Sequence, residues 1–412
     1  MPCPLPTLPP ALGSRILLCS FPGIGGVQSF CTSLAEGLKK VGYLPHVLLE
    51  NGEGSQATGV SMPPVVPSSV FRYTPFDNSY RVVSRMAKFI AAGGFDFIYP
   101  NTSAVAYRAI ALLGPQRPVA IGGCTGNNEH DYACNTDFAD YLDHIFSVSQ
   151  AGAKVLRDCL PGRSLGISVI PHGVEPSRIS LCRSFLGKLR LVFAGRFDVG
   201  KRLQDLIKVA RSLRHQGVQF DMTLAGDGPE RKTTEDACEQ FGIRNIVSFP
   251  GFLTRDEVEH LMQESHINLL LSQSEGFGLS VLEGMKVGCV PIVTETCGCK
   301  DAIRAGANGF VVRLGDVGAV AGLVRMLEQD RALLAHMSGQ AARTVQEEFS
   351  AEKEVARHRE ILGLAQEHHQ RHAAQTIPWR YEPPTLISYP WVPNWLAREL
   401  RRIKHRFAAS PH

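Results

Sequence analysis

The 412 residues lack any apolar run near the length of about 20 that a membrane-crossing helix needs, which argues against an integral membrane protein. The first residues have no basic region and are broken by prolines, so residues 1–14 are expected to be a Pro-rich lead-in rather than a secretory signal. The net charge is also small: 43 basic and 39 acidic residues leave +4. Such a balance argues against a general nucleic-acid binder.

A disulfide framework is equally absent from the pattern of cysteines. The eleven cysteines are an odd number, are scattered, and fall mostly in apolar stretches, as reduced buried thiols do. The only close pair is Cys297-x-Cys299, and with no Cys/His cluster nearby an ordinary loop is favoured over a zinc site. We therefore expect a reducing, cytoplasmic location.

Short apolar runs alternate with amphipathic stretches, which is typical of parallel strands joined by helices. A first series contains expected strands at 15–20, 46–50, 96–99, 119–122, 144–148 and 168–170, with an open loop at 52–69. The pattern pauses at 171–174, and a second series has expected strands at 189–194, 220–225, 246–249, 267–271, 290–293 and 309–312. A long charged helical stretch follows at 332–374. These patterns predict two α/β domains at 15–172 and 173–350, a helix crossing back at 351–375, and a tail at 376–412.

The tail holds all three tryptophans, Trp379, Trp391 and Trp395, and a net charge of +4. Residues 392–407 read as an amphipathic helix with one apolar face and one basic face, which suits a membrane interface. Packing of that face on the N-terminal domain, or on a second copy, remains an alternative.

Two glycine-containing loops follow predicted strands. Gly25 and Gly26 follow the first strand and could bring backbone N–H groups near an anion. A nicotinamide site, with Glu50 as the ribose-binding acid, stays an alternative, although the third glycine of that fingerprint is missing near Gln28. The loop after residues 189–194 resembles a P-loop, but Arg202 replaces the hydroxyl residue that binds magnesium.

The same loop places Arg196 and Lys201 around one turn, and two such cations suit a diphosphate. A third segment, 274–285, begins with Glu275 directly after an apolar strand. A glycine-x-glycine turn then starts a helix, and Glu283 follows within that helix. Carboxylates accept hydrogen bonds from sugar hydroxyls. The N–H groups of a helix start bind phosphate, here at Gly276, Phe277, Gly278 and Leu279.

Residues 189–314 resemble the donor-binding domain of the group 1 (family 4) retaining glycosyltransferases, which have the GT-B fold. The E-x7-E signature matches Glu275 and Glu283, and the basic pair matches Arg196 and Lys201. Cys299 stands where the family usually has glycine. The resemblance implies two Rossmann-like domains facing across a cleft, and transfer of a sugar from a nucleotide sugar with retention at the anomeric carbon.

The resemblance further implies a role for each matched residue. Glu283 would hold the ribose, Glu275 the sugar hydroxyls, and Arg196 and Lys201 the diphosphate. The backbone around Phe252 would contact the base, and Gly25 and Gly26 match the family's glycine loop.

On the acceptor side, Thr125 takes the position of the family's usual histidine, and His130 is a candidate replacement from a shifted loop. Neighbouring Asn127 and Asn128 are candidates for binding acceptor hydroxyls.

No aspartates are separated by a single residue, so no metal and no cofactor are expected. The expected acceptor is a glycan or a lipid-linked sugar, and a lipid-linked acceptor would be reached at the cytoplasmic membrane face. A synthase with a soluble sugar or sugar-phosphate acceptor, and a non-catalytic nucleotide-sugar-binding protein, remain alternatives.

Overall fold

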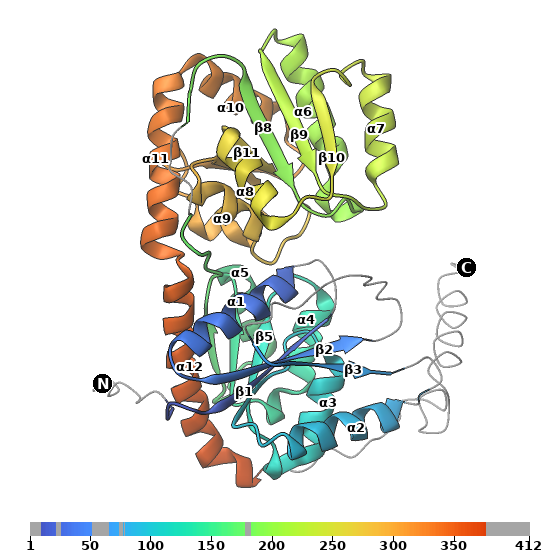
Figure 1. Cartoon of the computed structure of the whole chain (residues 1–412), viewed down its shortest axis with the longest axis vertical. Helices are drawn as coiled ribbons and strands as arrows, with labels where there is room; N and C mark the ends of the chain where they lie inside the picture. The colour runs from blue at the N-terminus through green and yellow to red at the C-terminus, as the bar shows by residue number, and fades with distance from the viewer. Residues whose placement is uncertain are drawn as a thin grey trace.

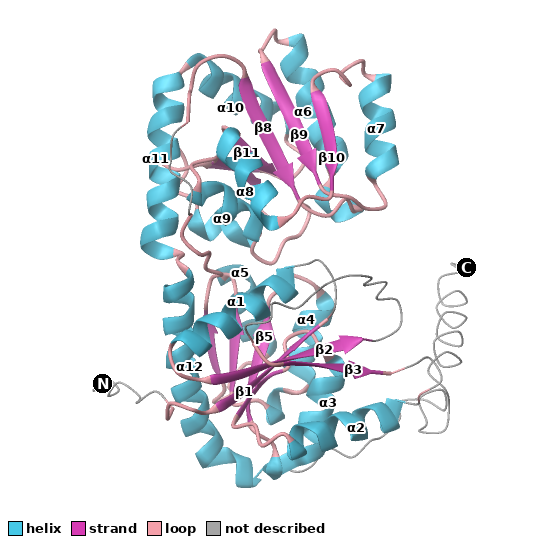
Figure 2. Ribbon diagram, in the orientation of Figure 1, coloured by secondary structure: helices cyan, strands magenta, loops and turns pink. Residues whose placement is uncertain are grey.

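The computed structural model describes residues 10–21, 26–51, 66–73, 77, 79–177 and 183–375. Two α/β bodies lie one above the other, the N-terminal body below and the C-terminal body above (Figure 1), and each is built around a single sheet (Figure 2). Gly25, most of the Pro-rich lead-in and the whole tail at 376–412 lie outside the described residues.

The N-terminal body contains a seven-stranded parallel sheet in the order β3-β2-β1-β4-β5-β6-β7. Its strands are β1 (Arg15–Ser20), β2 (Leu44–Asn51), β3 (Ser68–Arg72), β4 (Phe97–Tyr99), β5 (Val119–Cys124), β6 (His144–Ser147) and β7 (Gly166–Val169). Alternate residues of β1 enter different clusters of the core: Ile16 belongs to one and Leu17 to the other. Because successive side chains of a strand point to opposite faces, the sheet is covered on both faces.

The helices of this body are α1 (Gly26–Lys40), α2 (Ser79–Ala92), α3 (Ala104–Leu113), α4 (Glu129–Asp137) and α5 (Gln150–Cys159). Three of them begin at a residue whose side-chain oxygen accepts a hydrogen bond from the first turn, namely Ser103, Asn128 and Ser149. These N-caps fix where each loop after a strand ends and each helix starts.

The C-terminal body contains a six-stranded parallel sheet in the order β10-β9-β8-β11-β12-β13. Its strands are β8 (Leu189–Ala194), β9 (Phe220–Ala225), β10 (Val247–Gly251), β11 (Ile267–Leu270), β12 (Val290–Thr294) and β13 (Phe310–Val312). Its helices are α6 (Leu203–His215), α7 (Arg231–Gln240), α8 (Arg255–Glu264), α9 (Leu279–Lys286), α10 (Val317–Gln329) and α11 (Arg331–Glu348).

The last helix, α12 (Ala351–His372), returns from the C-terminal body and packs against α1 and strands of the N-terminal sheet (Figure 1). Its approach to α1 is close, since a side-chain carbon built at Gly37 would lie 2.3 Å from Val355 Cγ2. His172, in the linker between the bodies, lies with its Nδ1 3.1 Å from the Glu354 carboxylate. The chain therefore crosses between the bodies twice, side by side.

The structure confirms the predicted fold class: two Rossmann-like parallel-sheet domains of the GT-B type. It differs from the sequence expectations in two places. The expected loop at 52–69 overlaps β3, a short edge strand with little apolar signal. The helical stretch expected at 332–374 is divided into α11 and α12 at Phe349–Ser350, where the Ser350 side chain caps α12, and α12 covers most of the crossing helix expected at 351–375.

Candidate active site

Each sheet has one point where the strand order reverses. In the C-terminal sheet this point lies between β8 and β11, and in the N-terminal sheet between β1 and β4. Open parallel sheets bind ligands beyond the carboxyl ends of strands at such a switch point. The loops at 195–202 and 271–278, which carry the predicted donor residues, follow β8 and β11 and therefore lie at this place.

The loops after β8 and β11 meet through a side-chain contact. Lys201 ends a 3-10 turn after β8, and its Nζ forms an ion pair and hydrogen bond with Oε2 of Glu275. Both side chains are mostly buried, with 19% and 20% of their surfaces exposed. Arg196, in the same loop as Lys201, is exposed and has no ion pair with any described residue. One predicted cation thus already contacts a predicted sugar-binding acid, while the other is available to an anion.

The glycine-x-glycine turn shapes the start of α9. Gly278 has a φ of 91°, in the left-handed region that favours glycine, and it precedes α9 without a side-chain cap. The N–H groups at the start of α9 near Leu279 are therefore not capped by the preceding side chain. The ring of Phe277 is buried and contacts His172 and Phe349, so Phe277 can offer only its backbone to a ligand.

Glu283 lies one turn into α9 and is half-buried. Burial raises the pKa of its carboxyl, while the positive charges of Arg255 and Lys286 act in the opposite direction. The two glutamates therefore have different cationic neighbours, since Glu275 pairs with Lys201. Arg255 and Lys286 also line a crevice of about 910 Å³ between the bodies. Its lining residues are Glu36, Lys39, Lys40, Glu175, Pro176, Ser177, Arg255, Asp256, Glu259, His260 and Lys286.

Phe252 follows β10 at the same edge of the sheet. It comes directly after Gly251, whose φ is 84°, and 59% of its surface is exposed. A large exposed aromatic ring beyond a strand end is available to contact a ligand.

The N-terminal body touches the donor loop directly. Ser274 Oγ donates to the Asn127 carbonyl at 2.7 Å, and the Gln150 N–H donates to the Asp301 carboxylate at 2.8 Å. Gly276 packs so closely that an added side-chain carbon would lie 2.0 Å from the Thr125 carbonyl oxygen. Glycine at position 276 therefore permits the contact between the two bodies.

The predicted acceptor residues are placed differently from one another. Thr125 is buried, and its Oγ1 has no partner among the described residues. His130 is exposed, and its Nε2 lies 2.9 Å from the Thr102 carbonyl, so Nε2 carries the proton in that contact. The side-chain oxygens of Asn127 and Asn128 are taken by the Tyr132 hydroxyl and by the α4 cap respectively.

Sequence reasoning missed Ser20, the last residue of β1, and Asn101, two residues after β4, which lie at the N-terminal switch point. Both are buried, and Ser20 Oγ and Asn101 Oδ1 lack hydrogen-bond partners within the described part of the chain. Asn101 also has a φ of 49°, an uncommon backbone conformation for a non-glycine residue. The available signal was a polar residue at or just beyond the end of a buried strand. Gly26 begins α1 with open space around it, so no close contact requires glycine there.

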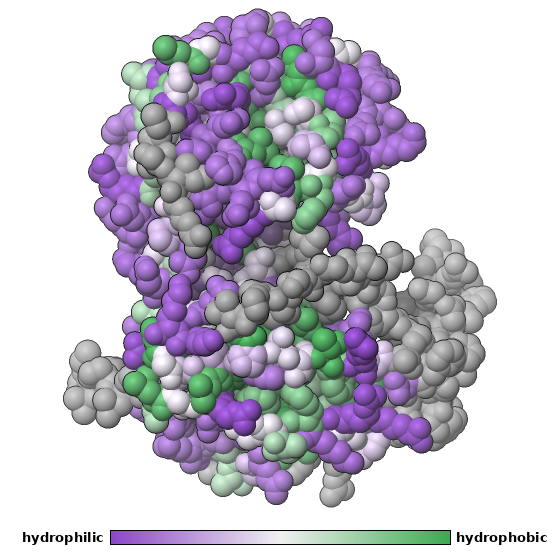
Figure 3. Space-filling model, viewed as in Figure 1, coloured by the Kyte–Doolittle hydropathy of each residue, from purple (hydrophilic) through white to green (hydrophobic). Residues whose placement is uncertain are grey.

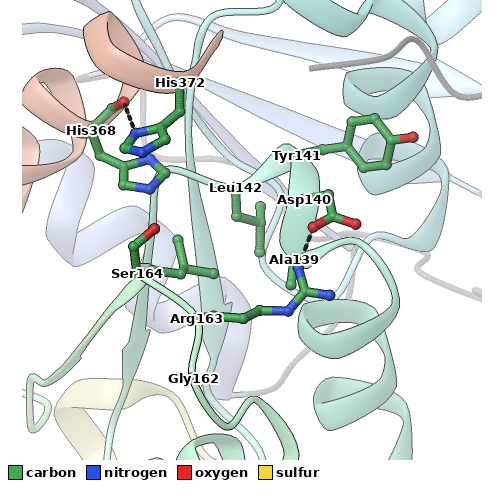
Figure 4. A pocket seen from close by; sticks show the side chains of 10 residues that line it. Ala139, Asp140, Tyr141, Leu142, Gly162, Arg163, Ser164, His368 and His372 are labelled. Carbon is green, nitrogen blue, oxygen red and sulfur yellow. Dashed lines mark hydrogen bonds and ion pairs between the residues drawn. The ribbon is translucent and has the colours of Figure 1, made fainter. Parts of the chain in front are cut away.

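A second pocket of about 660 Å³ lies where β6 and β7 begin, at the end of the N-terminal sheet away from the carboxyl ends of its strands (Figure 4). It is lined by Ala139, Asp140, Tyr141, Leu142, Gly162, Arg163, Ser164, Leu165, His368 and His372. The rings of His368 and His372 stack with centroids 4.1 Å apart, and Arg163 pairs with Asp140. None of the predicted donor or acceptor residues lines this pocket.

Within the described ranges, no three or more His, Cys, Asp or Glu side chains are grouped so that they could hold a metal ion. A search of the same ranges for a helix both long and apolar enough to span a membrane finds none.

Two family models match consecutive parts of the chain. Residues 24–178 match Glycosyltransferase Family 4, and residues 183–344 match the group 1 glycosyl transferases. The chain therefore belongs to the group 1, family-4-type glycosyltransferases.

Among curated relatives, the N-acetyl-alpha-D-glucosaminyl L-malate synthase of Bacillus anthracis is 33% identical over 171 residues, which are 42% of this chain and 44% of that protein. In two further relatives the match likewise covers less than half of the relative, 42% and 45%. Among solved structures, sucrose-phosphate synthase of Thermosynechococcus elongatus superposes with a TM-score of 0.70 at 17% identity, covering 88% of this chain and all of that one. Anabaena HepE in complex with UDP and glucose gives 0.69 at 18% identity, covering 85% and 99%. At these identities the structural likeness shows the fold alone.

Proposed function

We propose that this protein transfers a sugar from a UDP-sugar to a hydroxyl of a glycan or lipid-linked acceptor, with retention at the anomeric carbon and without a metal ion. The observation that carries the proposal is the meeting of Lys201 and Glu275 at the switch point between β8 and β11, beside the start of α9. UDP is the favoured nucleotide because a neighbour of the same fold is described with UDP and glucose.

In this proposal the donor lies along the edge formed by β10, β8 and β11. Glu275 accepts hydrogen bonds from sugar hydroxyls, and Glu283 accepts them from the ribose. Arg196, which has no ion-pair partner among the described residues, binds the diphosphate together with the uncapped N–H groups at Leu279. The exposed Phe252 and its backbone contact the base.

The leaving group is a nucleoside diphosphate whose negative charge grows as the bond to the sugar breaks. Arg196 and Lys201 stabilise that charge, which is the role a divalent metal ion has in other sugar transfers. Lys201 is held by Glu275 before the donor arrives, so donor binding exchanges part of this ion pair for contacts with phosphate and sugar.

The acceptor enters from the N-terminal body, beyond the ends of β1, β4 and β5. Ser20, Asn101 and Thr125 offer neutral hydrogen-bonding groups there, and His130 is the candidate for a proton-accepting role through its Nδ1. Neutral groups favour an acceptor that presents hydroxyls over one that presents a phosphate.

A contact with the cytoplasmic membrane face forms a further part of the proposal. It is supported by the amphipathic sequence at 392–407, and by the apolar surface of the N-terminal body, where Leu12 and Leu44 are 70% and 56% exposed. Figure 3 shows hydrophilic residues over most of the upper body and several apolar patches on the same face of the lower one. Vesicle co-sedimentation of the full chain and of a chain ending at Gln375 tests this contact. Equal, negligible binding of both to anionic vesicles would exclude it.

A second candidate is a nucleotide-sugar-binding protein without catalysis, which the replacement of the family's histidine by Thr125 favours. A melting-temperature screen over UDP-, GDP- and ADP-sugars tests donor binding, because a ligand raises the melting temperature by mass action. Release of UDP in the presence of candidate acceptors then separates an enzyme from a binding protein. Retained turnover in EDTA supports metal independence, and loss restored by magnesium or manganese would contradict it.

A further inference from the structure

One cavity of the molecule plays no part in the proposed transfer. The pocket beside the end of α12 has a volume of about 660 Å³, which lies within the roughly 300–1,000 Å³ of pockets that bind small ligands. It lies where β6 and β7 begin, whereas the proposed acceptor groups lie at the carboxyl ends of β1, β4 and β5. The six residues of β5 alone span about 17 Å, so a single sugar unit cannot reach from the pocket to the transfer site.

The wall of the pocket on the α12 side is held by contacts within the protein. The rings of His368 and His372 stack with centroids 4.1 Å apart, and His372 Nδ1 donates to the His368 carbonyl at 3.0 Å. His368 Nδ1 lies 3.5 Å from Oδ1 of Asp143. Asp143 is fully buried and forms an ion pair with the buried guanidinium of Arg117. This wall therefore has its shape before any ligand binds, as is usual for a binding pocket.

The opposite wall carries one charge of each sign. Asp140, in the turn before β6, pairs with Arg163, in the loop before β7, and their side chains remain 73% and 42% exposed. Figure 4 shows the stacked histidines on one side of the pocket, Asp140 and Arg163 on the other, and Leu142 between them. A carboxylate and a guanidinium together offer a ligand both acceptors and donors, and their charges cancel.

The rest of the lining includes apolar side chains and a glycine. Leu142 and Leu165 line the pocket and pack on the apolar core of the lower body. At Gly162, a side-chain carbon would meet no atom within 4 Å, so the loop before β7 leaves open space there. The pocket therefore combines apolar surface with exposed polar groups and is open to solvent.

This combination suits a neutral sugar better than an anion. The C–H faces of a sugar ring can lie on apolar side chains, and its hydroxyls both donate and accept hydrogen bonds. An anion fits less well, since Arg163 is already paired with Asp140 and His368 already lies against a carboxylate.

We propose that this pocket binds a neutral oligosaccharide that forms part of the acceptor glycan, several sugar units away from the hydroxyl that reacts. The ligand class rests on the proposed function, which takes a glycan as acceptor. Because one glycan then contacts the protein at two places, its effective concentration at the transfer site rises. The pocket lies outside the donor edge, so its loss should leave UDP binding unchanged.

The test titrates the full chain, without donor, with neutral tetrasaccharides of glucose, of N-acetylglucosamine and of mannose, and follows binding by NMR. Inorganic phosphate is the anionic probe. Ser164→Trp fills the pocket from an exposed position, and the double variant Asp140→Ala, Arg163→Ala removes the charged wall without changing the net charge. The matched control is Lys154→Ala, Asp158→Ala, which removes an exposed ion pair of α5 on the same body.

We expect the wild type and the α5 control to bind at least one of the tetrasaccharides, and both pocket variants to bind it about tenfold more weakly or worse. UDP affinity should be the same in all of these proteins. If Ser164→Trp fails to fold, the double variant at Asp140 and Arg163 decides the question alone.

The absence of tetrasaccharide binding in the wild type, or equal binding in the wild type and the pocket variants, would overturn the proposal. Phosphate binding that is lost in the pocket variants would overturn it too, because the pocket would then be an anion site. Failure of sugar transfer with tetrasaccharide binding intact would count against the proposed function alone, because the titration contains no donor.

Discussion

The switch points of the two domains carry different chemistry. In the C-terminal domain, charged side chains follow β8 and β11, and Lys201 and Glu275 already contact each other. In the N-terminal domain, Ser20 at the end of β1 and Asn101 after β4 are neutral and buried, and each has a polar atom without a partner among the described residues. The two domains share an architecture, so the difference lies in what each edge binds.

The difference follows from the ligands proposed for each edge. A nucleoside diphosphate always brings negative charge and vicinal hydroxyls, which cations and carboxylates match. An acceptor that offers only a hydroxyl requires no charged partner, and a buried charge without a partner would be costly. Substitutions at the switch-point edge of the C-terminal domain should therefore impair donor binding. Substitutions at the corresponding edge of the N-terminal domain should leave donor binding intact.

The largest effect is expected for Glu275→Gln. The change removes a charged acceptor from the sugar site and the ion-pair partner of Lys201, so turnover should fall by about 100-fold, on the order of one hydrogen bond to a charged group. UDP release in the presence of acceptor measures it. Glu239→Gln, an exposed glutamate on α7, is the control and should keep wild-type turnover.

Unchanged turnover in Glu275→Gln, with the melting temperature also unchanged, would remove Glu275 from the site. The contrast between the domains would then rest on the cations alone.

The second prediction concerns Arg196→Ala. Its guanidinium is exposed and lacks an ion-pair partner in the described part of the chain, so its loss should cost little stability. Turnover should fall about tenfold or more, because charge on the leaving diphosphate loses a partner in the transition state. The matched control is Arg211→Ala. Arg211 lies on α6, outside the loop, and its guanidinium lies over the ring of Phe241. A change in UDP affinity without any change in turnover would contradict the leaving-group role.

The residues proposed for the donor edge could be chosen from the sequence, because each of them is tied to a local pattern. Glu275, Gly278 and Glu283 belong to one strand-turn-helix segment, whose spacing places them without knowledge of distant contacts. The acceptor edge could not be predicted in the same way. Asn101 and Thr125 lie on separate loops that only strand pairing brings to one edge.

The contact of the Thr125 carbonyl with Gly276 exists only once the two bodies pack. The sequence predicted a domain boundary at 350 and a crossing helix from 351, but not the contacts that end α11 there, since helical periodicity continues through Phe349 and Ser350. The Ser350 cap and the bridge from Val174 to Ser350 depend on the linker, which lies far away in the sequence.

A smaller effect, confined to the acceptor, is expected for His130→Asn. Asparagine can still donate to the Thr102 carbonyl but cannot accept a proton at an Nδ1 position. The KM for the acceptor or the turnover should change by about tenfold, less than the roughly 100-fold or more that a general base typically contributes, while UDP affinity stays unchanged. His336→Asn, a residue of α11, is the control. A loss of UDP affinity in His130→Asn would contradict the division of roles between the domains.

The smallest effect is expected at Glu283, where a substitution should change UDP binding and protein stability in opposite directions. Burial raises the pKa of this carboxyl above its usual 4.5, so the folded protein disfavours the ionised form at neutral pH. The group therefore contributes stability only while it is protonated, and this contribution is lost as pH rises above the value for the unfolded chain.

Glu283→Gln removes that cost, so the melting temperature at pH 7 should rise by about 2 °C, while UDP affinity falls because the ribose loses a charged acceptor. In the wild type, UDP affinity should decline on acidification from a pH above the usual carboxylate range, and Glu283→Gln should abolish that decline. Calorimetric titrations with UDP between pH 5 and pH 8 measure the affinity of the wild type and of Glu283→Gln, and thermal unfolding at pH 7 measures their melting temperatures. A variant that binds UDP as tightly as the wild type across this range would place the ribose away from Glu283.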